Sequence, residues 1–169
     1  MKQFKTLLFA AMLFVGATNF TVAQSKIAHI NTTDLVQAMP EMKAAQAELE
    51  KLSKTYEADM KTMATEYQNK LKQYQAEAEA QTEEENTKRA QEVQNMEQSI
   101  RQFQSGAQQD LAKKEETLVK PILEKAKAAI SKVAKAQGFQ YVLDSSPGSG
   151  VLVSDGKDLM ADVKKELGF

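Results

Sequence analysis

Apolar residues recur every three or four positions along the centre of the chain, which predicts long amphipathic helices. In the first stripe, ten such steps cover 36 residues, a mean spacing of 3.6. A mean of 3.6 rather than 3.5 is typical of a nearly straight helix with weak supercoiling. The members of this stripe are Met42, Ala45, Leu49, Leu52, Tyr56, Met60, Met63, Tyr67, Leu71, Tyr74 and Ala78.

A second apolar stripe has the same spacing in two runs, one ending at Leu111 and one beginning at Leu118, and predicts a second helix. It consists of Val93, Met96, Ile100, Phe103, Ala107, Leu111, Leu118, Ile122, Ala126, Ile130 and Val133. We expect the two stripes to face each other in an antiparallel helical hairpin, a coiled-coil arm over residues 41–121. Thr82 stands three residues before Glu85, the spacing of a capping box at a helix start. The tip of the hairpin is therefore expected near residues 80–83.

Two prolines mark the foot of this hairpin. Pro40 fits the first turn of the first helix, where its missing N–H has no intrahelical partner in any case. Folding the chain at about residue 81 places Pro121 opposite Pro40. Pro121 removes one intrahelical hydrogen bond, so we expect it to kink the second helix and to let residues 122–137 turn into a body.

The chain ends contain short segments that are typical of strands. Lys26–Ile30 is rich in β-forming residues, and the turn and cap residues that follow it predict a short helix through Met39. Phe139–Asp144 alternates as a strand does, and Gly138 before it is a candidate helix C-cap. After a loop, Val151–Val153 is expected to form a third strand.

A last helix is expected after this strand, capped by Ser154 or Asp155. Its apolar face would consist of Leu159, Met160, Val163 and Leu167. The predicted fold class is α+β, mainly α: a long arm that projects from a small β-containing oligomerisation body. Residues 24–40 and 122–169 would form that body.

Residues 1–23 have the features of a signal peptide. Lys2 and Lys5 form a basic start, an apolar run extends from Leu7 to Val15, and the small residues before Gln24 allow cleavage near Ala23. The apolar run is too short to span a bilayer comfortably, so an uncleaved anchor is the weaker alternative. We therefore expect an exported protein.

Composition narrows the functional classes. The chain has no cysteine, which excludes disulfides, thiolate metal sites and a lipid-modified cysteine at its start. Without Lys2 and Lys5 it has 20 basic and 23 acidic residues, so strong attraction to nucleic acid or to an anionic membrane is not expected. Such short strands are marginal in water, which favours self-association.

The residue inventory does not favour an enzyme. The single histidine, His29, lies in a predicted strand without a partner for a nucleophile or a metal. Ser145–Gly150 lacks the lysine and the following helix of a phosphate-binding loop. The adjacent carboxylates of Glu83–Glu85 point in different directions on a helix, which is typical of a solvated tip. We expect no catalytic residue, no cofactor and no metal.

The methionine and aromatic residues of the stripes have two readings. Methionine suits surfaces that accept many partners, so these residues are candidates for contact with a client protein. The structural alternative is that they pack between the two helices and hold the hairpin together. The candidates are Tyr56, Met60, Met63, Tyr67, Tyr74, Met96 and Phe103.

The order of elements and the sequence at both ends resemble the Skp/OmpH family of periplasmic chaperones. The resemblance is carried by Lys26–Asn31 with the following Leu35, by the hairpin, by Tyr141–Asp144, by Val151 and by Asp158–Val163. It implies a periplasmic homotrimer whose arms enclose a cavity. In that cavity the family holds unfolded outer-membrane proteins without ATP.

The charge of the arm departs from the basic arms of the best-known family members. Residues 41–120 contain 12 Lys or Arg and 16 Asp or Glu. Lipopolysaccharide binding is therefore not carried over, and Lys88 and Arg89 are interpreted as solvated helix charges. An envelope scaffold or adaptor that binds folded partners remains the alternative function.

Overall fold

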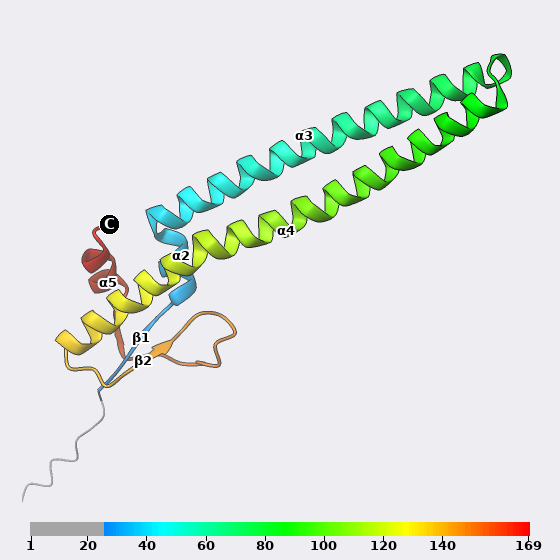
Figure 1. Cartoon of the computed structure of the whole chain (residues 1–169). Helices are drawn as coiled ribbons and strands as arrows, with labels where there is room; N and C mark the ends of the chain where they lie inside the picture. Colours follow the sequence, from blue (N-terminus) through cyan, green and yellow to red (C-terminus); the bar gives the residue numbers. More distant parts are fainter. Residues whose placement is uncertain (1–25) are drawn as a thin grey trace, which may run out of the picture.

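The computed structural model describes residues 26–169 and has a long two-helix arm on a small body (Figure 1). The predicted signal peptide lies outside the described residues. The elements are β1 (Ile27–Ile30), α2 (Thr32–Ala38), α3 (Pro40–Glu77), the 3-10 turn η1 (Ala78–Ala80), α4 (Glu83–Ala136), β2 (Tyr141–Asp144), β3 (Lys157–Asp158) and α5 (Met160–Leu167). The prediction of a mainly α, α+β fold is confirmed.

The start of the arm follows from local sequence chemistry. The Asn31 side chain accepts a hydrogen bond from the backbone N–H of Asp34 and caps α2. Met39 is extended, with ψ 131°, because the residue before a proline avoids the helical region. Pro40 then occupies the first turn of α3, as predicted. The break at Met39 thus separates α2 from α3 and lets the fully buried Met39 side chain enter the core.

The chain reverses between α3 and α4 (Figure 1). The Thr82 hydroxyl accepts a hydrogen bond from the backbone N–H of Glu85 at 3.2 Å, so the predicted cap of α4 is confirmed. The Asn86 side chain donates to the Ala78 carbonyl at 2.9 Å and ties η1 to the start of α4. These polar contacts make the turn without glycine or proline.

Helix α4 runs as one 54-residue helix through Pro121, so the kink expected at this proline does not interrupt the helix. Pro121 is exposed, as is Thr117, whose carbonyl loses its intrahelical donor to proline. Water can therefore hydrate that carbonyl, and the helix need not end there. Residues beyond Pro121 enter the body as a direct continuation of the arm helix, and Gly138, with φ 73°, follows its end.

The body contains a three-stranded parallel sheet in the order β2-β1-β3. Ile27 pairs with Tyr141 on one side of β1, and His29 pairs with Asp158 on the other. The predicted strand at Val151–Val153 is wrong, since the third strand lies at Lys157–Asp158. Leu159 directly follows this strand and is fully buried. Burial of Leu159 therefore places the two residues before it, Lys157 and Asp158, beside β1.

The cap of the last helix also differs from expectation. A carboxylate oxygen of Asp158, rather than Ser154 or Asp155, accepts a hydrogen bond from the Met160 N–H at 2.8 Å. The predicted apolar face of α5 is confirmed, because Leu159 and Val163 are fully buried and the other two members pack against the core.

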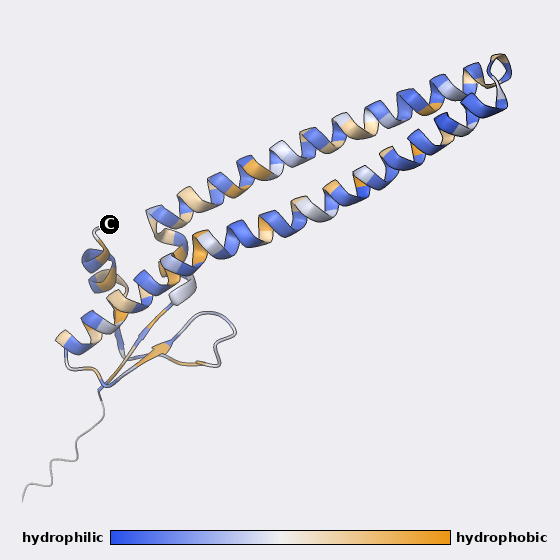
Figure 2. Ribbon diagram, in the orientation of Figure 1, coloured by the Kyte–Doolittle hydropathy of each residue, from blue (hydrophilic) through white to orange (hydrophobic). Residues whose placement is uncertain are grey.

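The hydrophobic core lies in the body, where α2, α5 and β1 pack on the last third of α4. Its buried residues are Ala28, Ile30, Leu35, Met39, Met42, Ala45, Ile122, Ala126, Ala129, Val133, Ala134, Leu159 and Val163. Hydrophilic residues dominate the arm, whereas β1 and β2 of the body are mainly hydrophobic (Figure 2). Within residues 26–169, no helix is long and apolar enough to cross a membrane.

Candidate functional site

The apolar seam of the arm remains half-buried along its length. Met42 and Ala45 are buried near the body, but none of the residues from Leu49 to Leu118 is. Two helices can shield only the faces they turn toward each other, so water reaches the edges of the seam. All seven predicted contact residues lie on this seam and all are half-buried. These seven side chains pack between the two helices and still expose part of their surface to solvent.

The middle of the arm brings three of these residues together. The Tyr56 and Phe103 rings meet edge to face, with centroids 5.8 Å apart and planes at 79°. The Tyr56 hydroxyl donates to Asp110 Oδ2 at 2.6 Å, and this hydrogen bond raises the pKa of Tyr56. Met60 joins both rings in lining an open groove of about 380 Å³. Tyr56 and Phe103 form an edge-to-face pair across the two helices, and the flexible side chain of Met60 lies in the groove beside it.

The remaining methionines lie farther along the arm. Met63 from α3 and Met96 from α4 line a smaller groove of about 250 Å³, together with Ile100. Tyr67 is half-buried on the same seam. The seam therefore offers several shallow apolar hollows rather than one deep pocket.

Tyr74, near the tip, is held by charged neighbours. Its hydroxyl donates to Glu92, which also pairs with Lys70, and the Lys70 hydrogen bond lowers the pKa of Glu92. The Arg89 guanidinium lies 4.7 Å from the centroid of the Tyr74 ring, a cation–π distance. Tyr74 is thus engaged within the hairpin.

Arg89 does not fit its interpretation as a solvated charge. Its side chain is only 15% exposed, with Nη1 2.9 Å from Glu77 and Nε 3.5 Å from Glu85. Lys88 does fit that interpretation, because it is 66% exposed and pairs with Glu84 one turn away. Arg89 therefore joins α3 to α4 near the tip.

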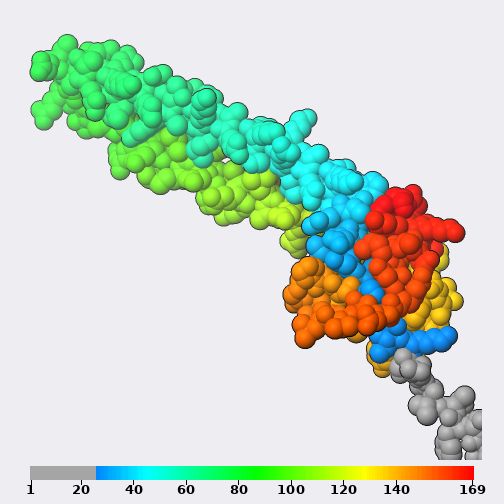
Figure 3. Space-filling model, turned by 180° about the vertical axis from the view of Figure 1, so that it is seen from behind, coloured from blue at the N-terminus to red at the C-terminus, as the bar shows by residue number. Residues whose placement is uncertain are grey.

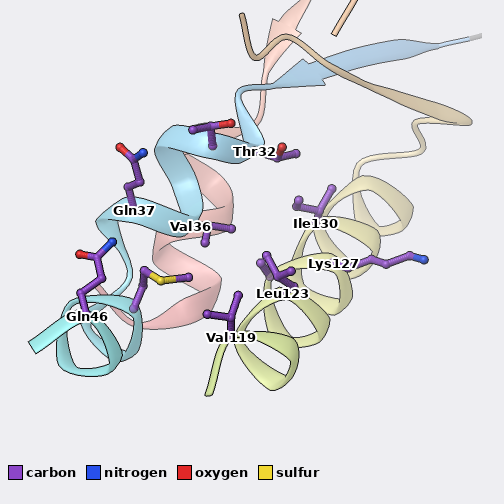
Figure 4. A pocket seen from close by; sticks show the side chains of 11 residues that line it. Thr32, Val36, Gln37, Gln46, Val119, Leu123, Lys127 and Ile130 are labelled. Carbon is purple, nitrogen blue, oxygen red and sulfur yellow. The ribbon is translucent and has the colours of Figure 1, made fainter. Parts of the chain in front are cut away.

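A groove of about 580 Å³ lies at the foot of the arm, and we call it the base groove (Figure 4). Val36 of α2 faces Val119, Leu123 and Ile130 of α4 across it (Figure 4). The other lining residues are Thr32, Thr33, Gln37, Met42, Gln46, Ala126 and Lys127. Its walls are thus apolar, with a largely uncharged polar rim.

Sequence reasoning missed this groove because it assigned α4 a single stripe. The chain carries adjacent apolar pairs, Leu118–Val119 and Ile122–Leu123, which widen the apolar face beyond one partner helix. Ile122 is 7% exposed in the core, whereas Leu123 is 49% exposed in the groove. These adjacent apolar pairs were the feature of the sequence that could have predicted the groove.

His29 has a structural environment. Its Nδ1 lies 3.3 Å from the Ser145 hydroxyl, and its Nε2 lies 3.2 Å from the Gly156 carbonyl. These contacts connect β1 to segments on both sides of it. No group of three or more potential metal ligands is found among residues 26–169.

The body exposes apolar side chains that a single copy does not cover. Tyr141 and Leu143 on the edge strand β2 are 61% and 44% exposed. Leu152 and Val153, in the segment that precedes β3, are 96% and 76% exposed. Exposed strand edges and aliphatic residues of this kind are typical of an interaction surface.

Comparison with known proteins agrees with this architecture. The profile of the OmpH family, described as outer membrane protein (OmpH-like), matches residues 26–167. A crystal structure of a candidate outer membrane chaperone (OmpH-like) from Caulobacter crescentus CB15 is similar, with a TM-score of 0.76 and 17% identity. The similarity covers 83% of this chain and 82% of the Caulobacter chain. No curated protein sequence matches the chain. Since the family profile spans nearly all of the described residues, the chain belongs to the OmpH-like outer membrane protein family.

Proposed function

We propose that this protein is a periplasmic chaperone that holds unfolded outer-membrane proteins without ATP. The observation that carries the proposal is the seam of the arm, which stays half-buried from Leu49 to Leu118. A fully buried seam would leave nothing apolar for a client, and a fully exposed one would not hold the hairpin together. Membership in the OmpH-like family supports the same role, as does a similar fold in a candidate outer membrane chaperone.

The mechanism is sequestration by many weak contacts. An unfolded β-barrel precursor exposes strands that pair with other chains and aggregate. Shallow hollows around Met60 and Met96 accept apolar side chains of varied shape, because the thioether side chain is flexible and polarizable. Each contact is small, so the client is released when it can fold elsewhere.

Several copies are needed to surround a client. The uncovered apolar residues of the body, among them Tyr141 and Leu152, favour assembly. A homotrimer would place three arms around one cavity, with the bodies at its closed end. No cofactor, metal or catalytic residue takes part in this mechanism.

The charges of the arm limit which clients are attracted over a distance. Many of the basic side chains on the arm are already paired with acids. These pairs are Lys54–Glu50, Lys70–Glu92, Lys88–Glu84, Arg89–Glu77, Arg101–Glu97 and Lys114–Glu48. We therefore propose that capture depends on apolar contact at short range and is only weakly sensitive to salt.

The decisive experiment is dilution of a urea-denatured outer-membrane barrel into buffer with the mature protein at several-fold molar excess. We expect light scattering from the barrel to fall strongly, and nucleotide to have no effect. Unchanged aggregation would remove the holdase proposal. A pull-down from envelope extract separates the alternative, since a scaffold captures one folded partner and a holdase captures many unfolded ones.

A further inference from the structure

The two helices of the arm lie side by side, so the arm has two broad faces, which Figures 1 and 3 view from opposite sides. In an antiparallel helix pair, the residues just before the seam positions of both helices lie on one face. The residues just after the seam positions lie on the other. The two faces of this arm differ in how the helices are joined across them.

Ion pairs between α3 and α4 bridge only the face of the residues that precede the seam positions, within residues 26–169. We call it the closed face. The groove beside Met63 and Met96 opens on this face, because its other lining residues include Glu66 and Glu92. The Tyr56 hydroxyl also reaches Asp110 on this face. The ion pairs are Glu41–Lys125, Glu48–Lys114, Lys70–Glu92 and Glu77–Arg89.

The opposite face has no ion pair between the two helices in the part of the chain that the structure describes, and we call it the open face. It carries three exposed glutamines, Gln46, Gln104 and Gln108. Their amides have no protein hydrogen-bond partner among residues 26–169. Because a side-chain amide both donates and accepts, these glutamines offer what the backbone of a bound chain needs.

Grooves follow one another along the open face. The groove that contains Met60 reaches Gln108. A second groove of about 520 Å³ begins one turn later at Ala112 and continues past Val119. Val119 and Leu123 line both this groove and the base groove, so the row continues to the foot of the arm. The other residues of the second groove are Glu115, Glu116, Lys120 and Glu124.

The length of this row matches one strand of a membrane barrel. From Gln104 to Leu123 the helix rises about 28 Å, at 1.5 Å per residue. An extended chain rises about 3.3 Å per residue, so about nine residues span the same distance. A membrane-spanning β-strand has about 9–11 residues, and alternate ones are apolar. Its apolar side chains can therefore all point into the grooves while its polar side chains face water.

We propose that the open face of the arm, from Gln104 to Leu123, binds one extended strand segment of an unfolded outer-membrane barrel. Alternate apolar side chains of the segment enter the row of grooves, and the amides of Gln104 and Gln108 hydrogen-bond to its backbone. This inference rests on the proposed function and names the face of the arm and the client segment. A strand held in this way offers fewer free backbone groups to other unfolded chains.

The first test is photo-crosslinking of the mature protein to a urea-denatured barrel after dilution. A photoreactive side chain in place of Gln108 or Ala112 reports on the open face. The same group in place of Gln102 reports on the closed face, and in place of Gln109 on the outer side of α4. All four positions are exposed. We expect about fivefold or more cross-linking at the two open-face positions, and equal yields at Gln102 and Gln108 would overturn the proposal.

The second test identifies the bound segment with labelled synthetic peptides and the full mature protein, by fluorescence anisotropy. One peptide has ten residues that alternate between apolar and polar. A second has the same composition with the apolar residues in one block, and a third alternates over only five residues. We expect the long alternating peptide to bind roughly tenfold more tightly than either control. Equal affinities would reject a strand as the occupant.

The third test adds two carboxylates to either face. Gln108→Glu with Ala112→Glu should weaken binding of the alternating peptide about tenfold or more, because the charges must be desolvated under the strand. Gln102→Glu with Gln109→Glu adds the same charges away from the grooves and should change the affinity less than about twofold. Circular dichroism checks the helices. Should the open-face variant lose helix, Ala112→Gln fills the groove without a charge and is expected to weaken binding as well. Equal affinities of the open-face variant and its control contradict the open face.

Aggregation of the denatured barrel is measured in parallel by light scattering. A wild type that binds the alternating peptide on the open face but does not suppress aggregation would reject the holdase function and leave the strand-binding face standing. Suppression that is equally strong in the open-face variant and its control would keep the function and reject this face as the client site.

Discussion

The Tyr56 hydroxyl and Asp110 Oδ2 lie 2.6 Å apart and join α3 to α4 across 54 positions of sequence. This hydrogen bond stands beside the edge-to-face contact of Tyr56 with Phe103. Together they form a cross-link in the middle of an arm that otherwise has a half-buried seam. The arm is therefore held at a few points, and the hollows beside them remain open.

Replacing Tyr56 with Phe should loosen the middle of the arm. The ring contact with Phe103 is kept while the hydrogen bond to Asp110 is lost. We expect amide hydrogen exchange around residues 52–60 and 103–111 to become roughly two- to tenfold faster, with the body unchanged. Tyr67→Phe is the matched control, because no protein partner of its hydroxyl is found in the part of the chain that the structure describes. Equal effects of both variants would contradict the role of Asp110.

Asp144 should make the body sensitive to strong acid. Partial burial opposes ionisation of its carboxyl, but hydrogen bonds from Ser146 and Thr32 outweigh it and lower the pKa to about 2, from 3.8. Because the folded-state pKa is the lower one, the stabilisation is complete well above pH 3.8 and is lost as the pH falls through about 2.

The size of this effect is limited by the exposure of Asp144, so we expect at most about 1 kcal/mol. Asp144→Asn cannot ionise and should lose less stability between pH 5 and pH 2 than the wild type does. Urea unfolding at the two pH values measures the difference. Asp34→Asn is a useful comparison, because the Asp34 carboxylate also accepts a side-chain hydrogen bond, in its case from Asn31. Identical acid dependence in wild type and Asp144→Asn would be the contrary result.

Gly106 makes α4 more flexible around it, and we expect that alanine can replace it without strain. A Cβ at this position would meet no atom within 4 Å, so alanine fits without strain. Alanine in a helix interior is more stable than glycine by about 1 kcal/mol. Gly106→Ala should therefore slow hydrogen exchange locally around residues 103–110.

The arm as a whole should exchange its amide hydrogens faster than residues 122–143. The buried residues of α4, such as Ile122 and Val133, lie in the body, whereas the seam beyond Leu49 is only half-buried. Uniform protection along α4 would contradict this expectation.

Client contact should concentrate at the hollows of the seam. A photoreactive side chain in place of Met60 or Met96 should cross-link to a bound barrel precursor, because both residues line open grooves. The same group in place of Thr62, which is exposed on α3 away from the seam, should cross-link several-fold less. Equal yields at all three positions would indicate that the seam has no special part in binding.

Much of the fold could be predicted because its signals are local. The spacing of Met42 through Ala78, the Thr82 cap and the proline at position 40 each depend on residues a few positions apart. The error at Val151–Val153 had a different origin. That segment is β-forming, but the edge of β1 was occupied by residues 157–158, whose place depends on burial of Leu159.

The sequence by itself determined the helices, their caps and the apolar stripes through which the two arm helices pack. A helical period and a cap each depend only on residues a few positions apart. Only the tertiary structure decided which member of each apolar pair enters the core, so that Ile122 is buried and Leu123 lines the base groove. It also decided that Arg89 lies over Tyr74 rather than in solvent. These outcomes depend on which surfaces meet across the hairpin and the body. The residues that compete for each place in this packing lie far apart in the chain, so no local pattern shows which of them is buried.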